Sequence, residues 1–243
     1  MKKILKLLGF GALLAYFPVI LAFVSFDRHK TLCHDIKSEI SDSIANKFIS
    51  AEDIRNIALE KYPDILGKPI EDINTEKMEH FFEKYPAIEN CEVYYTLGGV
   101  LHIDVKQKRP VLRVFNRNMS WYIDEDGDRM PLSTKHTAHI LVANGHIDKI
   151  KNKEELFDLA MFINDDPFWR SQIEQIYVDR NGEYILIPRV GDHTIEFGGI
   201  DKMETKFRNL KALYQNGWDA REWNLYNKVS LKYNGQIVCS KVN

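Results

Sequence analysis

The chain has 243 residues with a formal net charge of −2, of which 28% are charged and 12% aromatic. This composition is that of an ordinary folded protein, and it excludes a disordered acidic tail or a basic nucleic-acid-binding arm. No basic block stands out beyond the first few positions, so charge gives no reason to expect DNA or RNA as a partner. The length allows one large domain, or two small ones, beside a short anchor.

The N-terminal segment predicts a membrane anchor. Residues 1–6 contain three lysines and no acidic residue, whereas residues 7–26 contain no charged side chain. A helix rises about 1.5 Å per residue, so a helix over residues 7–26 is about as long as the hydrocarbon core is thick, roughly 30 Å. Because the lysines precede the apolar run, the positive-inside rule predicts a cytoplasmic N-terminus and an extracytoplasmic remainder.

A cleaved signal peptide is the alternative interpretation of this segment. Its apolar region is usually about 7–15 residues long and ends in a small-x-small cleavage site. Residues 21–26 read Leu-Ala-Phe-Val-Ser-Phe, with bulky side chains where cleavage requires small ones. We therefore expect an uncleaved anchor, and under either interpretation the remaining chain is exported.

Three cysteines, Cys33, Cys91 and Cys239, lie in the exported part. An odd number of cysteines cannot all pair within one chain, and no C-x-x-C spacing is present for metal or redox chemistry. Each lies in an apolar or strand-like stretch, so we expect small buried hydrophobic side chains. The sequence leaves a disulfide between Cys33 and Cys91 open.

The first exported domain follows a polar tether of residues 27 to about 31. A weakly alternating strand is expected over Thr31–Ile40. Ser50 begins a helix through an approximate capping box with Asp53, and Pro63 ends it. Asn74 begins a second helix, which ends at Tyr85 because Pro86 disfavours helical backbone before it.

A hairpin completes this domain, since alternating strands flank the turn residues Gly98-Gly99. The resulting order is strand, helix, helix, strand, strand, which is the order of a POTRA module, a small sheet with two helices on one face. Such a module is expected to leave a strand edge exposed, which suits the docking of extended segments.

Arg109-Pro110 marks a joint, after which the pattern becomes mostly β. The expected fold class is α+β, with a mostly antiparallel β domain over residues 111–243 that includes two helices, roughly Lys153–Asn164 and Lys202–Asn216. Its other strands are predicted over residues 111–115, 120–123, 139–142, 175–178, 183–187 and 194–197. The chain finishes with a predicted hairpin, in which the turn Asn234-Gly235 joins Val229–Tyr233 to Gln236–Cys239.

No catalytic, cofactor-binding or metal-binding residues are predicted. The acidic run Asp124–Asp128 lacks the sixth-position glycine and twelfth-position glutamate of a calcium loop, so a solvated hairpin turn is expected. His136 and His139 form an H-x-x-H, but they lack the glutamate of zinc proteases, and His139 lies in a predicted strand. A nucleophile elbow, a phosphate-binding glycine loop and a dinucleotide fingerprint are also missing from the sequence.

Several stretches resemble motifs of the FtsQ/DivIB family of bacterial division proteins. Tyr85–Val93 is similar to its "P-x-I-x-x-A-x-V" strand, and Leu101–Pro110 is similar to its "L-x-I-x-V-x-E/Q-R-x-P" segment. Tyr122–Gly127 resembles the "Y-x-D-x-x-G" hairpin, and Tyr226–Tyr233 resembles the closing "V-D-L-R-Y" strand. A basic tail, one membrane span, a POTRA domain and a β domain together are the plan of that family.

The resemblance implies a non-enzymatic, single-pass adaptor of the divisome in the inner membrane at the division septum. The cytoplasmic tail would be residues 1–6, the transmembrane helix 7–26, the linker and POTRA domain 27–110, and the β domain 111–243. In that family, FtsB/DivIC and FtsL are the partners, and FtsB adds a strand beside the last strand of the β domain. The resemblance assigns this partner-binding role here to Tyr233, Gly235, Gln236, Ile237, Val238 and Cys239.

Two other functions stay open at this point. An exported enzyme acting on the cell wall would need a catalytic constellation that the motifs do not supply. A POTRA-bearing transport or assembly factor would need an outer-membrane barrel with many alternating strands. The last hairpin could also complete the sheet without binding a partner. The oligomeric state, the partner's contact residues and the mobility between the two domains are not determined by the sequence.

Overall fold

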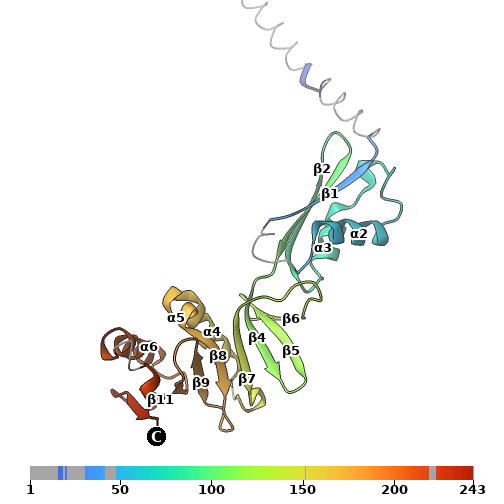
Figure 1. The fold of residues 1–243 in the computed structure, drawn as a ribbon. Coiled ribbons are helices and arrows are strands. Elements are labelled where there is room, and N and C mark those ends of the chain that lie inside the picture. Colours follow the sequence, from blue (N-terminus) through green and yellow to red (C-terminus); the bar gives the residue numbers. More distant parts are fainter. Residues whose placement is uncertain are drawn as a thin grey trace, which may run out of the picture. The chain divides into compact units, whose positions relative to one another are not determined.

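The computed structural model describes residues 16–18, 20, 31–41, 48–150, 152–218 and 223–242. The chain forms two compact units, of which the first ends at Gln107 and the second begins at Lys108 (Figure 1). The predicted cytoplasmic tail and nearly all of the predicted span over residues 7–26 lie outside the described residues. Within the described ranges, no helix is long and apolar enough to cross a bilayer.

The first unit contains a three-stranded sheet with the order β1-β3-β2. The central strand β3 is parallel to β1 and antiparallel to β2. Two helices and a short 3-10 helix, η1, connect β1 to β2, so the predicted order of strand, helix, helix, strand, strand is confirmed. The elements are β1 (Asp35–Ile40), α2 (Ala51–Lys61), η1 (Ile70–Asp72), α3 (Thr75–Phe82), β2 (Ile88–Tyr95) and β3 (Val100–Gln107).

Capping side chains set the beginnings of both helices, as the sequence predicted. The Ser50 Oγ accepts from the Asp53 N–H at 3.2 Å, and the Asp53 carboxylate accepts from the Ser50 N–H at 3.0 Å, which is a complete capping box. The Asn74 Oδ1 accepts from the Lys77 N–H at 2.8 Å and caps α3. Helix α3 ends at Phe82, three residues before the predicted end at Tyr85.

One face of this small sheet packs against the helices. In β2 and β3 the buried side chains alternate with exposed or half-buried ones, as expected when one face is covered and the other is solvated. The helices contribute Ile54, Ala58, Met78 and Phe82, all buried, to the same core. Burying an aliphatic or aromatic side chain of this size contributes about 1.5–3 kcal/mol, so this core is what holds the helices to the sheet.

The second unit contains a nine-stranded sheet with the order β12-β11-β10-β9-β8-β7-β4-β5-β6. Most of its described strand pairs are antiparallel, as predicted, but β7 is parallel to both of its neighbours and β10 is parallel to β11. The strands are β4 (Pro110–Asn116), β5 (Met119–Asp124), β6 (Arg129–Met130), β7 (Leu141–Gly145), β8 (Ile173–Val178), β9 (Tyr184–Pro188), β10 (Thr194–Gly198), β11 (Tyr226–Ser230) and β12 (Val238–Lys241).

Parallel neighbours need a long connection, while antiparallel ones need only a turn. The chain from β4 to its parallel neighbour β7 passes through β5 and β6, and helices make the connections of the other two parallel pairs. Helices α4 and α5 join β7 to β8, and α6 with the turn after it joins β10 to β11. The helical elements are η2 (Ile147–Lys149), α4 (Lys153–Asp165), α5 (Pro167–Gln172), α6 (Met203–Ala212), the π-helical turn η3 (Leu213–Gly217) and η4 (Trp223–Leu225). Among the described residues there are therefore three α-helices in this unit, not the two that were predicted.

Helix α5 is the element that the prediction missed. Its N-cap is Asp166, whose Oδ1 accepts from the Phe168 N–H at 2.8 Å, and Pro167 occupies the first helical position. This helix places Trp169 in the core of the second unit, where its ring lies 4.9 Å from that of Phe207 in α6. Phe207 in turn lies 5.0 Å from Phe197 of β10, so aromatic contacts hold α5 and α6 on the sheet.

Candidate functional site

The last strand, β12, ends the large sheet and pairs only with β11. The register sets Val238 opposite Ser230 and Cys239 opposite Val229. Successive residues of a strand direct their backbone N–H and C=O groups to opposite sides, so half of these groups on β12 face away from β11. In the part of the chain that the structure describes, no further strand covers them. The strand predicted to dock a partner is therefore an edge strand.

Two backbone hydrogen bonds define which residues of β12 face outward. The Val242 N–H donates to the Leu225 carbonyl at 2.9 Å, so the backbone of this residue faces β11. The Leu231 N–H donates to the Glu196 carbonyl of β10 at 2.9 Å. The backbone groups of Ser230, one residue earlier, therefore face β12, where Ser230 is paired with Val238. By the same alternation the outward backbone groups of β12 belong to Cys239 and Lys241.

The connection before β12 differs from the predicted hairpin. Strand β11 ends at Ser230 and β12 begins at Val238, so residues 231–237 form a loop and only two of the six predicted partner-binding residues lie in the strand. The expected turn at Asn234-Gly235 is present, and Gly235 has the left-handed φ of 73°. The loop is longer because β11 pairs with β10 over Lys228–Ser230, three residues earlier than the predicted strand end at Tyr233.

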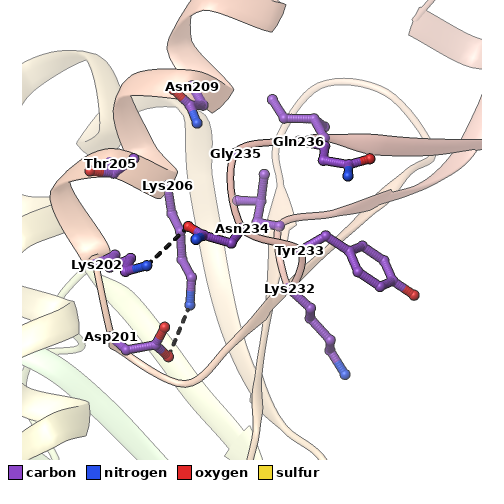
Figure 2. Close-up of a pocket in the computed structure, with 12 residues that line it drawn as sticks. Asp201, Lys202, Thr205, Lys206, Asn209, Lys232, Tyr233, Asn234, Gly235 and Gln236 are labelled. Atoms are coloured by element: carbon purple, nitrogen blue, oxygen red, sulfur yellow. Dashed lines mark hydrogen bonds and ion pairs between the residues drawn. The ribbon is translucent and has the colours of Figure 1, made fainter.

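The beginning of α6 supports this loop. The Lys202 Nζ donates to the Asn234 Oδ1 at 3.0 Å, and Figure 2 shows Asn234 turned toward Lys202 while Tyr233 points away from α6. The Lys206 Nζ donates to the Gly199 carbonyl at 2.7 Å and lies 3.4 Å from the Asp201 carboxylate. Sequence reasoning missed these lysines as part of the site, since only the folded chain brings them beside residues about thirty positions later.

A small hollow lies between α6 and the loop, lined by residues of both (Figure 2). Its volume is about 60 Å³. Binding sites for small molecules are usually some 300–1,000 Å³. The hollow is therefore of a size to accept one side chain of a docked protein.

The charges around this edge are mostly paired within the chain. Lys232 forms an ion pair with Glu183 of the loop before β9, and this contact raises the pKa of Lys232. Lys228 lies 2.9 Å from Glu196, and this hydrogen bond lowers the pKa of the Glu196 carboxyl group. The paired charges leave only a weak electric field at this edge, so its main available features are backbone groups and apolar side chains.

Apolar side chains are exposed along the same edge. Tyr233 is 59% exposed, Val238 41% and Val242 55%. Cys239 and Ile237 instead pack partly against the core, and burial raises the pKa of the Cys239 thiol. An edge strand with exposed apolar side chains is a template for pairing with another chain.

In contrast to β12, both edge strands of the small sheet have backbone groups bonded to side chains. On β2 the Val93 N–H donates to the Glu79 Oε1 of α3 at 2.8 Å. On β1 the Arg55 Nε of α2 donates to the Ile36 carbonyl at 3.2 Å, and the Ile36 N–H donates to the Asp35 Oδ1 at 2.9 Å. The expectation that this module leaves a free strand edge is thus wrong at these positions, because its own helices bind the edge backbone.

The acidic run Asp124–Asp128 is a hairpin turn organised by one buried carboxylate. The Asp124 Oδ1 accepts from the N–H groups of Asp126 at 3.2 Å and Asp128 at 2.7 Å, while the Lys108 Nζ donates to its Oδ2 at 2.7 Å. The expectation of a fully solvated turn holds for residues 125–128 but is wrong for Asp124, which is buried. The three donors compensate for the loss of hydration of the buried Asp124 carboxylate.

The remaining polar candidates do not assemble into a site. Over the described residues, no group of three or more His, Cys, Asp or Glu side chains is arranged to hold a metal ion. The strand predicted to begin at His139 is β7, which begins only at Leu141, so His139 precedes it. The Tyr122 Oη, on β5, accepts from the Ala138 N–H at 3.2 Å and so fixes the segment that contains both histidines.

All three cysteines are free. Cys91 is paired with Val105 on β3, whereas Cys33 precedes Asp35, which is paired with Val100, so the two buried thiols lie toward opposite ends of the small sheet. This register excludes the disulfide that the sequence had left open, because bonded cysteines need Cα atoms within about 7 Å. Burial raises the pKa of Cys91 to about 12, as expected for an inert structural thiol.

The two folds and the edge strand define a protein that has a POTRA-like module and a mixed β domain. Comparison with protein families agrees: residues 31–106 match the POTRA-like domain, and residues 109–240 match the family described as FtsQ/DivIB, C-terminal related. The second match covers more than half of the chain, so the chain belongs to the FtsQ/DivIB family. A search of curated proteins found no match. The family is one of non-enzymatic cell division proteins associated with the membrane.

Proposed function

We propose that this protein is a non-enzymatic, membrane-anchored adaptor of the division machinery. It holds FtsB/DivIC-like and FtsL-like single-span proteins at the septum, and it does so by offering β12 to an extended segment of the FtsB/DivIC-like partner. Family membership supports the role in division. The observation that carries the docking mechanism is the position of β12 at the end of the nine-stranded sheet.

Strand addition at β12 follows from its unpaired backbone groups. A partner strand would bond to the outward N–H and C=O groups of Cys239 and Lys241, and main-chain bonds of this kind supply affinity. Specificity would come from the exposed side chains of Val238 and Tyr233 and from the hollow beside α6. Binding alone is proposed, because the family is one of non-enzymatic division proteins.

The anchor is the second part of the proposal. The uncharged stretch of residues 7–26, preceded by Lys2, Lys3 and Lys6, would span the inner membrane and leave both folded units outside the cytoplasm. An adaptor for single-span partners benefits from such an anchor, since confinement to the same membrane raises the effective concentration of the partner.

In-cell photocrosslinking tests the docking edge. A photoreactive residue at Gln236, in the loop beside β12, should capture a small single-span protein of the FtsB/DivIC type. The same residue at Arg208, which is exposed on α6, is the matched control and should capture far less. Lys211, three residues further along the same helix, is not chosen as the control position, because its Nζ donates to the Asp166 carboxylate at 3.2 Å. Equal capture from both positions, or none from Gln236, would reject docking at this edge.

A further inference from the structure

Three exposed leucines lie at one end of the POTRA-like unit, in segments that are far apart in the sequence. Leu32 precedes β1, Leu66 lies in the loop between α2 and η1, and Leu97 lies in the turn between β2 and β3. Their exposed fractions are 50%, 43% and 74%. Exposed leucines are common singly, but three on one small end of a domain form a surface that is suited to an apolar partner.

Backbone hydrogen bonds hold the three segments together. The His34 N–H donates to the Gly99 carbonyl at 3.0 Å, and the Cys33 N–H donates to the Lys68 carbonyl at 2.8 Å. The Gly67 N–H returns a bond to the Cys33 carbonyl at 2.6 Å. A side chain at Gly99 would place its Cβ 2.3 Å from the Leu32 carbonyl oxygen, so glycine is needed for this close approach. We call these three segments, residues 31–34, 66–69 and 96–99, the leucine tip.

The length of chain before the tip limits its distance from the membrane. The uncharged stretch ends at Phe26, and the tip begins at Thr31, five peptide steps later. A fully extended chain advances at most about 3.3–3.6 Å per residue, so the tether reaches about 18 Å at most. The headgroup layer on each side of the hydrocarbon core takes up roughly 5–7 Å of that distance. The tip is therefore held at or just above the headgroups.

From these observations we infer that the leucine tip rests in the interfacial layer of the bilayer and fixes one end of the POTRA-like unit on the membrane surface. This inference rests on the anchor that is part of the proposed function. The exposed Lys68 stands beside Leu66 and Gly67, where its ammonium group can face lipid phosphates while its stem lies along the apolar surface. The lipid surface is the occupant that the short tether brings within reach.

Depth-dependent fluorescence quenching tests the inference on the full-length protein in lipid vesicles. A fluorophore is attached to Lys68→Cys at the tip or to Lys84→Cys as control, in a Cys239→Ser background, because Cys33 and Cys91 are buried. Lys84 is exposed and precedes β2 at the end opposite to the turn that bears Leu97, since Ile88 pairs with Gln107 and Tyr95 with Leu101. The quencher is a lipid with a nitroxide close to the headgroup. Resistance of the protein to carbonate extraction reports the anchor independently.

The expected result is a carbonate-resistant protein whose tip fluorophore is quenched severalfold more than the control fluorophore. The exchange of all three leucines for serine should then lower the quenching at the tip to the level of the control without loss of the anchor. Quenching that is weak at both positions, or equal at both, in an anchored protein would overturn the inference and leave the adaptor function untouched. Crosslinking between the tips of two copies would also overturn it. A protein that carbonate extracts would overturn the anchor, and the leucine tip with it.

Discussion

In the second unit, one buried carboxylate and one buried histidine stabilise the local structure around them. Asp124 satisfies two backbone donors and Lys108 at once, which explains why the Y-x-D-x-x-G stretch needs its aspartate. Lys108 is the first residue of this unit, so the ion pair ties its beginning to the turn after β5. Removing one partner of a buried ion pair is strongly destabilising, because the other charge then stays buried without compensation.

His193 is the other residue whose chemistry follows from burial. Its Nε2 lies 2.7 Å from the Tyr214 Oη, and its ring lies 5.0 Å from that of Trp218. Burial lowers the pKa of His193, so the imidazole is neutral in the folded protein. The ring thus belongs to an aromatic cluster with Tyr214, in the turn η3 that follows α6, and Trp218, the residue after that turn.

We predict that this histidine makes stability depend on pH. The unfolded chain binds a proton at His193 near the ordinary value of about 6.5, whereas the folded chain binds one only at lower pH. Its contribution is therefore complete above about pH 6.5 and is lost as the pH falls from that value through the lowered pKa. Urea unfolding of the solubilised protein above and below this value should show the loss, and His193→Phe should reduce it. Exchange of the exposed His80 for Gln is the control; an unchanged pH dependence in His193→Phe would contradict the assignment.

At the scale of elements, the helices of the first unit decide which strand edges are available. Glu79 of α3 bonds to the N–H of Val93 in β2, and Arg55 of α2 bonds to the carbonyl of Ile36 near the beginning of β1. An extended segment could pair there only after it had displaced these side chains. Natural proteins commonly protect edge strands in this way against unwanted pairing.

Glu79→Ala should open the β2 edge. The Val93 N–H would lose its partner, which should lower the free energy of unfolding by about 1–2 kcal/mol. The newly available edge should also raise self-association, measured by sedimentation of the solubilised protein. Glu76→Ala removes a carboxylate from the first turn of the same helix and leaves the Val93 bond in place, so it serves as control. If both variants stay as stable and as monomeric as the parent protein, Glu79 does not protect this edge.

Most elements of the first unit could be predicted from the sequence because their signals are local. Ser50 and Asn74 cap helices, and the turn before Gly99 lies between two alternating strands. The second unit was harder, since the sequence contains no local signal for which strands become parallel neighbours. The Asp166-Pro167 pair is a recognisable helix start that was overlooked. The end of β11 could not be predicted, because its pairing with β10 and the ion pair at Lys232 are tertiary contacts.

The candidate site was predictable in position but not in form. The resemblance pointed to residues 233–239, and these do lie at the last strand of the sheet and in the loop before it. The backbone groups that face outward on β12 belong instead to Cys239 and Lys241, and Lys241 lies beyond the predicted set. The sequence could not show this, because the direction of each residue depends on the register with β11.

For the molecule as a whole, the two units differ in how their strand edges are protected. On each edge strand of the small sheet, one backbone group is bonded to a side chain of its own helices, while the large sheet has β12 at one edge and β6 at the other. The two units differ in this respect although both are α/β folds of one chain. In the proposed function, partner capture belongs to the second unit, and in the inference above, positioning near the membrane belongs to the first.

A proline at Lys241 tests the central claim most directly, because the claim depends on an outward N–H of β12. Lys241→Pro removes that N–H from an exposed position at the end of the strand, and Lys241→Ala removes only the side chain. Affinity for the extracytoplasmic part of an FtsB/DivIC-type partner would be titrated with both variants and the parent protein. We predict a loss of about tenfold or more, roughly 1.4 kcal/mol, for the proline variant alone. Equal affinity of a folded proline variant and the alanine variant would contradict strand addition at β12.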